Sequence, residues 1–210
     1  EVVDAQAEQC VRDGIDGERR LKLMMAALCH DFGKVSTTVF KDGRWRAPAH
    51  DIEGETPTRE FLELAGFVVP EQKSVNQFVE DVVALVVCHM RHISFGGSRR
   101  EVRRLALAVN IKDLAQIVES DHSGRPPLPK GLPENMKKIL ELAEELAVED
   151  EKPQPILQGR HLVAGADCVI QTPMKQGKAI GEFLKRAFEA QIEGEFETFE
   201  GAVAWAIKNL

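Results

Sequence analysis

A long apolar run that ends in two titratable side chains is the feature that most constrains the fold of this chain. Residues 18–32, ERRLKLMMAALCHDF, are apolar on almost every side of a helix, with only Lys22 charged between Leu21 and Cys29. A helix of this kind needs cover on every face, which predicts a central, buried position. The run stops at Gly33, and glycine commonly ends helices.

Helical spacing of apolar residues recurs through most of the chain. One exception is Asp42-Gly43, which lies between two short β-prone runs and predicts a small hairpin or an extended loop. The expected fold class is therefore all-α, a helical bundle with one small hairpin. Further helices are expected over residues 75–90, 111–121, 136–143, 177–192 and 199–210.

Composition excludes several protein classes. The 210-residue chain has a net charge of -7, with 43% hydrophobic and 29% charged residues, which is typical of a soluble globular protein rather than a disordered one. No apolar run approaches the roughly 20 residues that span a bilayer, and the first residues lack the layout of a signal peptide. The four cysteines form no CxxC pair, which predicts reduced thiols. We expect a cytoplasmic protein with no membrane partner.

The sequence GRPPLPKGLP, residues 124–133, divides the chain because no helix crosses it. We expect one domain over residues 1–130 and a smaller helical region over 131–210. The first 132 residues carry 18 basic and 20 acidic side chains, and the remainder carries 9 and 14. Five of the six histidines precede residue 123. The chemistry is therefore expected in the first part.

Five side chains are candidate metal ligands. His30 and Asp31 close the apolar helix, where an uncompensated charge is costly and a bound cation would resolve the conflict. His89 and Asp121 each lie on the apolar stripe of another helix, and His50 precedes a further one. Each residue alone has an ordinary alternative, as a helix cap or a hydrogen-bonded core histidine. Three helices that each direct a metal-type ligand inward favour a metal site.

These residues also carry a resemblance. The block LCHDFGK, residues 28–34, resembles the His-Asp block of the HD superfamily of metal-dependent phosphohydrolases, and VESDHSGR contains Asp121 where that family has its distant Asp. HDIEG, residues 50–54, and VVCHM, residues 86–90, match the intervening histidine blocks. More narrowly, the chain is similar to the HD and C-terminal regions of bacterial CCA-adding tRNA nucleotidyltransferases and poly(A) polymerases. ILQGRHLVAGA and GKAIGEFLKRAFEAQIEGEFET carry the C-terminal similarity.

The resemblance implies a metal-dependent phosphohydrolase that acts on nucleotide or RNA phosphoesters. The expected substrates are a 2′,3′-cyclic phosphate, a 2′-nucleotide or a small phosphomonoester, with tRNA as a further partner. His30, Asp31 and Asp121 would be primary ligands, Asp31 would also orient the attacking water, and His50 and His89 would complete a second site or bind phosphate. The mixed donor set suits divalent Mn, Ni, Co, Fe or Zn, with Mg as a further choice.

Basic side chains near these blocks are candidate phosphate ligands. Lys34 follows the helix end and is a candidate catalytic residue that neutralises phosphate, and Arg125 follows Asp121 in its block. For both, the alternative is a solvated surface side chain. A further basic strip is expected to follow an RNA backbone or to be an ordinary solvated face. It consists of Arg99, Arg100, Arg103 and Arg104.

Two departures from the family pattern qualify the expectation. The family's first metal-binding His would lie upstream of Glu1, and the nucleotidyltransferase signature is absent. We therefore expect weak or substoichiometric metal binding, and the alternative function is a non-catalytic tRNA-binding and structural region with a degenerate metal site. Trp45 and Trp205 are interpreted as packing residues, because no run of aromatic residues indicates a base-stacking platform. His92, His122 and His161 are interpreted as surface or supporting residues.

Overall fold

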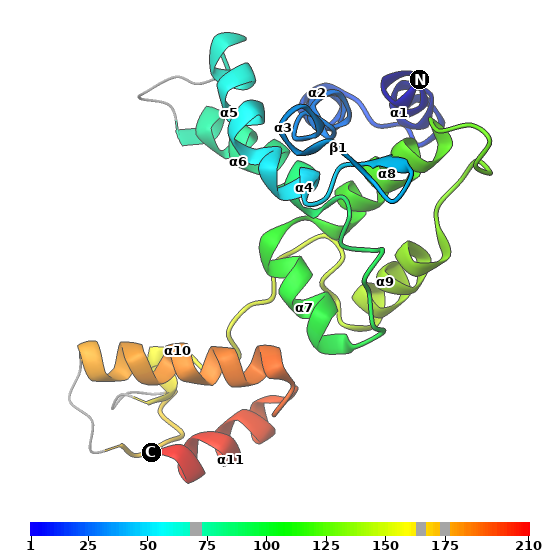
Figure 1. Cartoon of the computed structure of the whole chain (residues 1–210). Helices are drawn as coiled ribbons and strands as arrows, with labels where there is room; N and C mark the ends of the chain where they lie inside the picture. The colour runs from blue at the N-terminus through cyan, green and yellow to red at the C-terminus, as the bar shows by residue number, and fades with distance from the viewer. Residues whose placement is uncertain (68–72, 163–166, 173–176) are drawn as a thin grey trace. The chain divides into compact units, whose positions relative to one another are not determined.

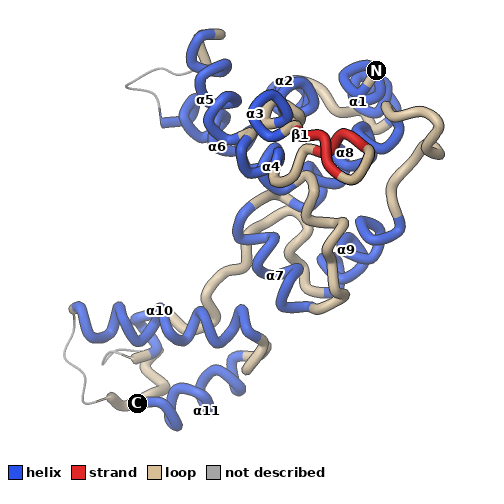
Figure 2. Tube along the Cα trace, in the orientation of Figure 1, coloured by secondary structure: helices blue, strands red, loops and turns tan. Residues whose placement is uncertain are grey.

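Helices form nearly all the regular structure of this protein (Figure 2), as the sequence predicts. The structure is a computed structural model that describes residues 1–67, 73–162, 167–172 and 177–210, with the side chains of residues 73–75 outside the description. The described residues form two units, Glu1–Lys152 and Pro153–Leu210. No helix within the described ranges is long and apolar enough to cross a membrane.

The first unit contains a helical bundle and one hairpin (Figure 1). Helices α2, α6 and α8 contact one another in the bundle, and α1 contacts both α2 and α8. The elements are α1 (Val2–Arg12), α2 (Gly17–Cys29), α3 (Lys34–Thr37), β1 (Val39–Lys41), β2 (Arg44–Arg46), α4 (His50–Glu53), α5 (Glu55–Leu64), α6 (Lys73–Cys88), α7 (Arg99–Ala108), α8 (Ile111–Ser123) and α9 (Glu134–Glu145).

Helix α2 is central but not covered on every face. Leu23 and Ala26 are fully buried in the core. Leu21 and Leu28, however, are each 41% exposed, so the prediction of an entirely buried helix is wrong. The physical reason is that α2 packs mainly on α1, α6 and α8, which cover only part of its circumference.

A buried carboxylate holds α2 against α8. Asp113 of α8 accepts a hydrogen bond from Arg19 Nε at 2.8 Å and lies 2.6 Å from Lys22 Nζ. Its own amide donates to the side chain of Asn110, which caps the helix. The carboxylate is therefore neutralised where it is buried, which avoids the cost of an unpaired charge. This contact fixes the relative position of the two helices that carry His30-Asp31 and Asp121.

The division between the two units lies after Lys152, not after the expected residue 130. The Pro-rich segment does interrupt the helices, but the chain beyond it returns to the first unit. Met136, Ile139 and Ala143 of α9 are buried in the first core, together with Val148. The apolar face of α9 explains the shift, because it packs on α7 and α8.

The predicted hairpin is present. β1 and β2 pair antiparallel with Phe40 opposite Trp45, and the turn residues Asp42 and Gly43 both have positive φ, at 53° and 75°. Such a turn matches the twist of the flanking strands. Trp45 is 71% exposed, so its interpretation as a packing residue is wrong. The reason is that, among the described residues, β1 and β2 pair only with each other, and all their side chains are exposed.

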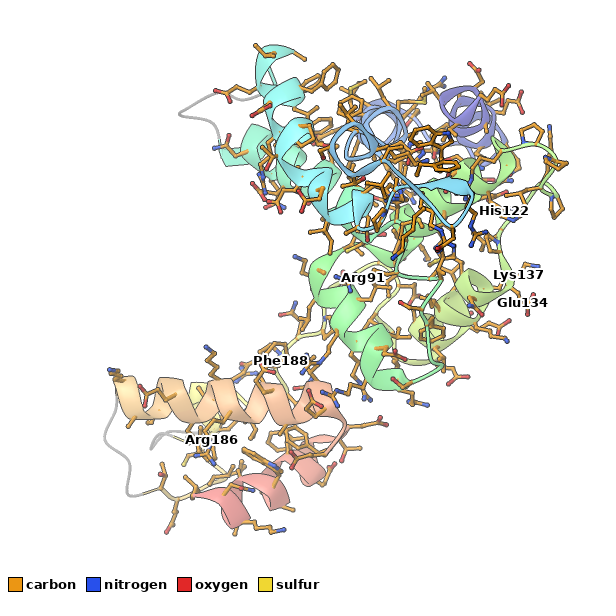
Figure 3. The ribbon with its side chains drawn as sticks, viewed as in Figure 1. Arg91, His122, Glu134, Lys137, Arg186 and Phe188 are labelled. Atoms are coloured by element: carbon orange, nitrogen blue, oxygen red, sulfur yellow. The ribbon has the colours of Figure 1, made fainter. Side chains whose placement is uncertain are left out.

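The second unit has its own small core. It contains a short 3-10 helix (Gly159–His161), α10 (Lys178–Glu193) and α11 (Phe199–Asn209), close to the predicted bounds. The Thr198 side chain caps α11 by accepting from the amide of Gly201. Trp205 packs against Phe183 and Phe196, which confirms its structural role. Figure 3 labels Arg186 and Phe188 on α10.

Candidate metal centre

Five expected ligand residues lie at the ends of four elements of the first unit. His30 and Asp31 follow the last residue of α2, and His89 follows the last residue of α6. His50 begins α4, and Asp121 lies in the last turn of α8. All except Asp31 are buried, and Asp31 is partly buried. Helix ends therefore deliver these side chains to one region without interrupting the bundle.

Gly33 brings two of these elements together. A Cβ at this position would overlap the carbonyl oxygen of His50 and lie 2.6 Å from the amide nitrogen of Gly54. Its φ of -65° is available to any residue, so close backbone approach is what requires glycine here. The sequence interpretation of Gly33 as a helix-ending residue is incomplete, because its main effect is to seat α4 against the His30-Asp31 turn.

Three histidines share one hydrogen-bond arrangement. Nδ1 of His30, His50 and His89 lies 2.8, 2.8 and 2.6 Å from the backbone carbonyl oxygen three residues earlier, that of Ala27, Ala47 and Val86 respectively. A carbonyl oxygen only accepts, so each Nδ1 carries the proton. In the neutral rings Nε2 then presents a lone pair, which is the state a metal ligand needs.

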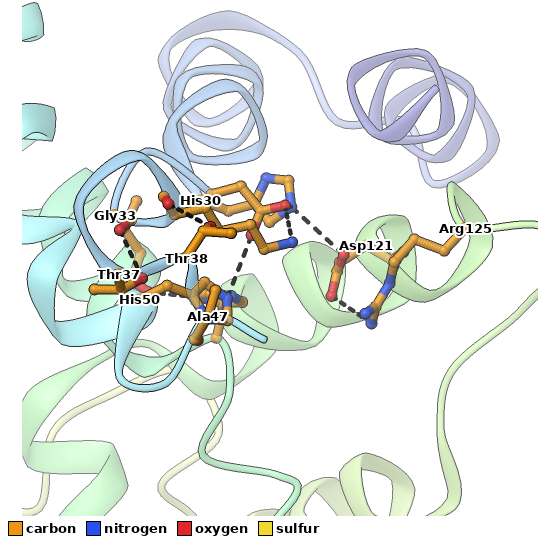
Figure 4. Close-up of polar contacts among 12 residues, drawn as sticks. His30, Gly33, Thr37, Thr38, Ala47, His50, Asp121 and Arg125 are labelled. Carbon is orange, nitrogen blue, oxygen red and sulfur yellow. Dashed lines mark hydrogen bonds and ion pairs between the residues drawn. The ribbon is translucent and has the colours of Figure 1, made fainter. Parts of the chain in front are cut away.

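The Nε2 atoms and carboxylates form two groups that share Asp31. His30 Nε2 lies 3.3 Å from Asp31 Oδ2 and 3.4 Å from Asp121 Oδ1. His50 Nε2 lies 3.3 Å from the other oxygen of Asp31, Oδ1. Asp31, His50 and His89 each offer a ligand atom within 4.8 Å of the others. The two carboxylate oxygens of Asp31 thus face different histidines, and Figure 4 labels both of these histidines, His30 and His50.

Burial and charge set opposite pKa shifts within the cluster. Burial lowers the pKa of His30, but the carboxylates of Asp121 and Asp31 outweigh it and raise this pKa to about 9. Burial lowers the pKa of His89 to about 4. Burial opposes ionisation of both carboxyl groups. His30 and Lys34 nevertheless hold the pKa of Asp31 below its ordinary value, and His30 and Arg125 do the same for the pKa of Asp121. The site therefore combines ionised carboxylates with a neutral His89 at neutral pH.

The residues fit a divalent cation. Among the described residues no group makes a well-directed hydrogen bond to His30 Nε2, although this atom is buried between two carboxylates. A ring nitrogen that is buried between two carboxylates without a directed partner lies in an environment that a cation would satisfy once the ring loses its proton. The donor set of three imidazoles and two carboxylates suits transition metals and does not select among Mn, Fe, Co, Ni and Zn.

The two cationic candidates lie against the carboxylates of the cluster. Lys34 Nζ contacts Asp31 Oδ2 at 2.6 Å, and Arg125 donates to Asp121 Oδ2 at 2.8 Å. Both side chains are about half exposed, and Figure 4 shows Arg125 beside Asp121. They lie where a phosphate bound at the cluster would meet them, so their phosphate-binding role stays a prediction.

The arginine strip on α7 is only partly exposed. Its helix begins at Arg99 and is capped by reciprocal hydrogen bonds between Ser98 and Glu101. Arg99, Arg100 and Arg104 are exposed, but Arg103 is buried, so the four do not form one solvent-facing surface. Arg99 also pairs with Glu145 at 3.3 Å. RNA contact by this helix stays a prediction, with Arg103 removed from the contact surface.

His92 takes a supporting position next to the cluster, one of the two alternatives expected for it. It is buried, and its Nδ1 lies 2.9 Å from the carbonyl oxygen of His89, which repeats the arrangement of the three site histidines. Burial lowers its pKa, and Asp121 opposes the shift, which places His92 on the Asp121 side of the cluster. The three-residue spacing of His89 and His92 is the sequence signal that favours the supporting position over a surface one. His122, on the same turn of α8 as Asp121, is labelled in Figure 3.

The pKa of His30 predicts how metal affinity depends on pH. Below pH 9 this imidazole is protonated in the metal-free protein and must lose its proton to bind a metal through Nε2. Affinity should therefore rise about tenfold per pH unit from pH 6.5 toward 9 and then level off. Calorimetric titrations with Mn²⁺ in buffers of different ionisation enthalpy would measure the released proton. An affinity that is constant between pH 7 and 9 would contradict the assignment.

Comparison with known proteins gives results that agree with this geometry. The model of a family described as the HD domain matches residues 5–144, which contain all five ligand candidates. The CC-adding tRNA nucleotidyltransferase of Thermus thermophilus is 29% identical over 194 residues. That alignment covers 90% of this chain but 40% of the relative, so the chain spans well under half of that protein's length. The comparison with solved structures gave no match.

Proposed function

The chain belongs to the HD domain family, and from this premise we propose that the cluster around Asp31 is the metal centre of a phosphohydrolase. One observation carries the proposal: five donor side chains from four elements converge, with their histidine tautomers fixed for ligation. If these residues were only helix caps or hydrogen-bonded core histidines, they would not need to converge on one another.

The donors divide into two sets for divalent ions. His30 and Asp121 would hold one ion, His50 and His89 would hold a second, and Asp31 would contribute one oxygen to each. Bound divalent ions lower the pKa of water and polarise a phosphoryl oxygen, which is the chemistry that phosphoester hydrolysis needs.

The protein's own groups have separate tasks in this proposal. Asp31 is ionised at neutral pH because its pKa is held well below the ordinary range, so it can accept a hydrogen bond from a water molecule and orient it. Lys34 and Arg125 now neutralise Asp31 and Asp121, and both are exposed enough to turn toward a phosphate instead. Their cationic groups would stabilise negative charge that develops on the phosphoryl oxygens.

The proposed substrates are 2′,3′-cyclic nucleotides, 2′-nucleotides or small phosphomonoesters of RNA metabolism. The similarity to a CC-adding tRNA nucleotidyltransferase supports an RNA-related substrate. The alternative function is a tRNA-positioning region without catalysis. The same similarity supports it, but it does not explain why the histidine tautomers are fixed or why Asp31 faces two histidines.

Hydrolysis of 2′,3′-cyclic AMP by the 210-residue chain tests the proposal. Purified protein is stripped with EDTA and assayed with Mn²⁺, Ni²⁺, Co²⁺, Fe²⁺, Zn²⁺ or Mg²⁺, with 2′-AMP and p-nitrophenyl phosphate in parallel. We expect metal-dependent activity that EDTA removes and that one or more transition metals restore, because the donor set favours them. If no ion supports turnover while tRNA still binds, the scaffold function replaces the proposed one.

A further inference from the structure

The hairpin formed by β1 and β2 exposes two aromatic rings as a pair. Phe40 is 62% exposed and Trp45 is 71% exposed. They lie opposite each other in the strand register, with ring centroids 5.2 Å apart and an interplanar angle of 65°. These rings bury little against the bundle, so core packing does not explain them. An exposed aromatic pair of this kind marks an interaction surface.

The same hairpin carries a concentration of positive charge. Lys41, Arg44 and Arg46 are exposed on it, against a single acid, Asp42, which pairs with Arg46 at 3.3 Å. Side chains alternate along a strand, so these cations project from the face opposite Phe40 and Trp45. The whole chain has a net charge of -7, so the positive charge of the hairpin is opposite in sign to the net charge of the chain.

This combination favours one kind of partner. Unpaired nucleotides offer a flat π-surface that stacks on aromatic side chains and a phosphate backbone that attracts cations. A second copy of the hairpin would bring like charges together, which opposes self-association through this surface. Duplex nucleic acid would satisfy the cations but leave the rings without a free base face.

Both ends of the hairpin join residues of the metal centre. β1 directly follows Thr38. The Thr38 hydroxyl donates to the backbone carbonyl oxygen of Lys34, and the side chain of Lys34 contacts Asp31. β2 ends at Arg46, next to Ala47, whose carbonyl oxygen fixes the tautomer of His50. Figure 4 labels Thr38, Ala47 and His50. The hairpin therefore projects directly from the cluster.

We propose that the hairpin, residues 39–46, is a binding arm for single-stranded RNA that leads an unpaired end to the metal centre. A base stacks on the Phe40–Trp45 pair on one face, and the phosphates that flank it pass the strand edge to reach Lys41, Arg44 and Arg46, which project from the other face. The inference rests on the proposed function for the reaction at the centre and deepens it by naming the substrate class.

Binding to a fluorescein-labelled RNA of about 12 nucleotides tests the arm, since sites of this type cover roughly 4–16 nucleotides. The measurement is fluorescence anisotropy in EDTA at low salt, so that no hydrolysis contributes. The chain contains two tryptophans and no tyrosine, so intrinsic emission reports Trp45 and Trp205 alone. Stacking should quench part of this emission, and Trp45→Phe should remove the quenched part.

Trp45→Ala should weaken RNA binding about tenfold, as expected for loss of one stacked base, and Arg44→Ala should weaken it and reduce its salt dependence. The matched controls are Leu64→Ala, which removes an apolar side chain that is 90% exposed on α5, and Lys138→Ala on α9. Both controls should bind as the wild type does. Urea unfolding of each variant checks that these surface changes leave stability unaltered.

The outcomes separate this inference from the proposed function. Selective loss of binding in Trp45→Ala, with single strands preferred over the annealed duplex, supports the arm whether or not hydrolysis occurs. Wild-type affinity in Trp45→Ala, or equal affinity for the duplex, overturns it. Trp45-dependent dimerisation without RNA binding also overturns it. Turnover of 2′,3′-cyclic AMP without RNA binding overturns the arm and leaves the proposed function standing.

Discussion

Asp31→Asn should weaken divalent-metal binding at least about 100-fold, more than the 10- to 100-fold typical of losing a supporting residue. The reason is geometric, because the two oxygens of Asp31 face His30 and His50, each at 3.3 Å. An amide of the same size loses the negative charge and one of the two oxygens, so one donor set loses a ligand and the other keeps only a weaker, neutral oxygen. Calorimetry with Mn²⁺ measures the loss directly, and hydrolysis of 2′,3′-cyclic AMP should fall with it.

The chain supplies its own control for this substitution. His50-Asp51 is a second His-Asp dipeptide, but the structure places Asp51 outside the ligand cluster of Asp31, His50 and His89. Asp51→Asn should therefore bind Mn²⁺ as the wild type does. A thermal unfolding experiment adds an independent readout, since bound metal raises the melting temperature in proportion to the logarithm of its affinity. Equal metal-induced stabilisation of Asp31→Asn and wild type would refute the shared role of Asp31.

The two His-Asp dipeptides show what the sequence determines and what it leaves open. The sequence makes His30, Asp31 and His50 candidates but not Asp51, and its spacing predicts buried positions for His89 and Asp121, as observed. Local patterns succeed there because burial of a stripe follows from helix periodicity. Which carboxylate faces which imidazole depends on how α2, α4 and α8 meet, and no local pattern encodes that.

The predictions about the exposure of Trp45 and about the boundary between the two units differ from the structure for a related reason. The hairpin itself was predictable from Asp42-Gly43, because turn chemistry is local. The exposure of Trp45 was not, because it depends on the absence of a neighbouring strand within the described sheet. Likewise, the Pro-rich segment predicted a break but not that Ile139 would return to the first core. Tertiary packing decides these points.

Gly33→Ala should disrupt the centre without touching any ligand. Ala is conformationally acceptable at φ -65°, so the effect comes only from its Cβ, which would overlap the backbone of His50. Relief requires α4 to move away from the His30-Asp31 turn, and His50 Nε2 then leaves its position 3.3 Å from Asp31. We expect Mn²⁺ affinity to fall about 10- to 100-fold, with a loss of about 1–3 kcal/mol in the free energy of unfolding.

Gly181→Ala is the matched control for that substitution. Gly181 lies within α10, and a Cβ there would meet nothing within 4 Å. Alanine should leave metal binding unchanged and should stabilise the helix by up to about 1 kcal/mol, because it has the higher helix propensity. Urea unfolding and calorimetry with Mn²⁺ on both variants separate overlap at Gly33 from a general effect of replacing glycine. If Gly33→Ala binds Mn²⁺ with wild-type affinity, close approach at residue 33 does not position His50, and the turn and α4 must be held together by other contacts.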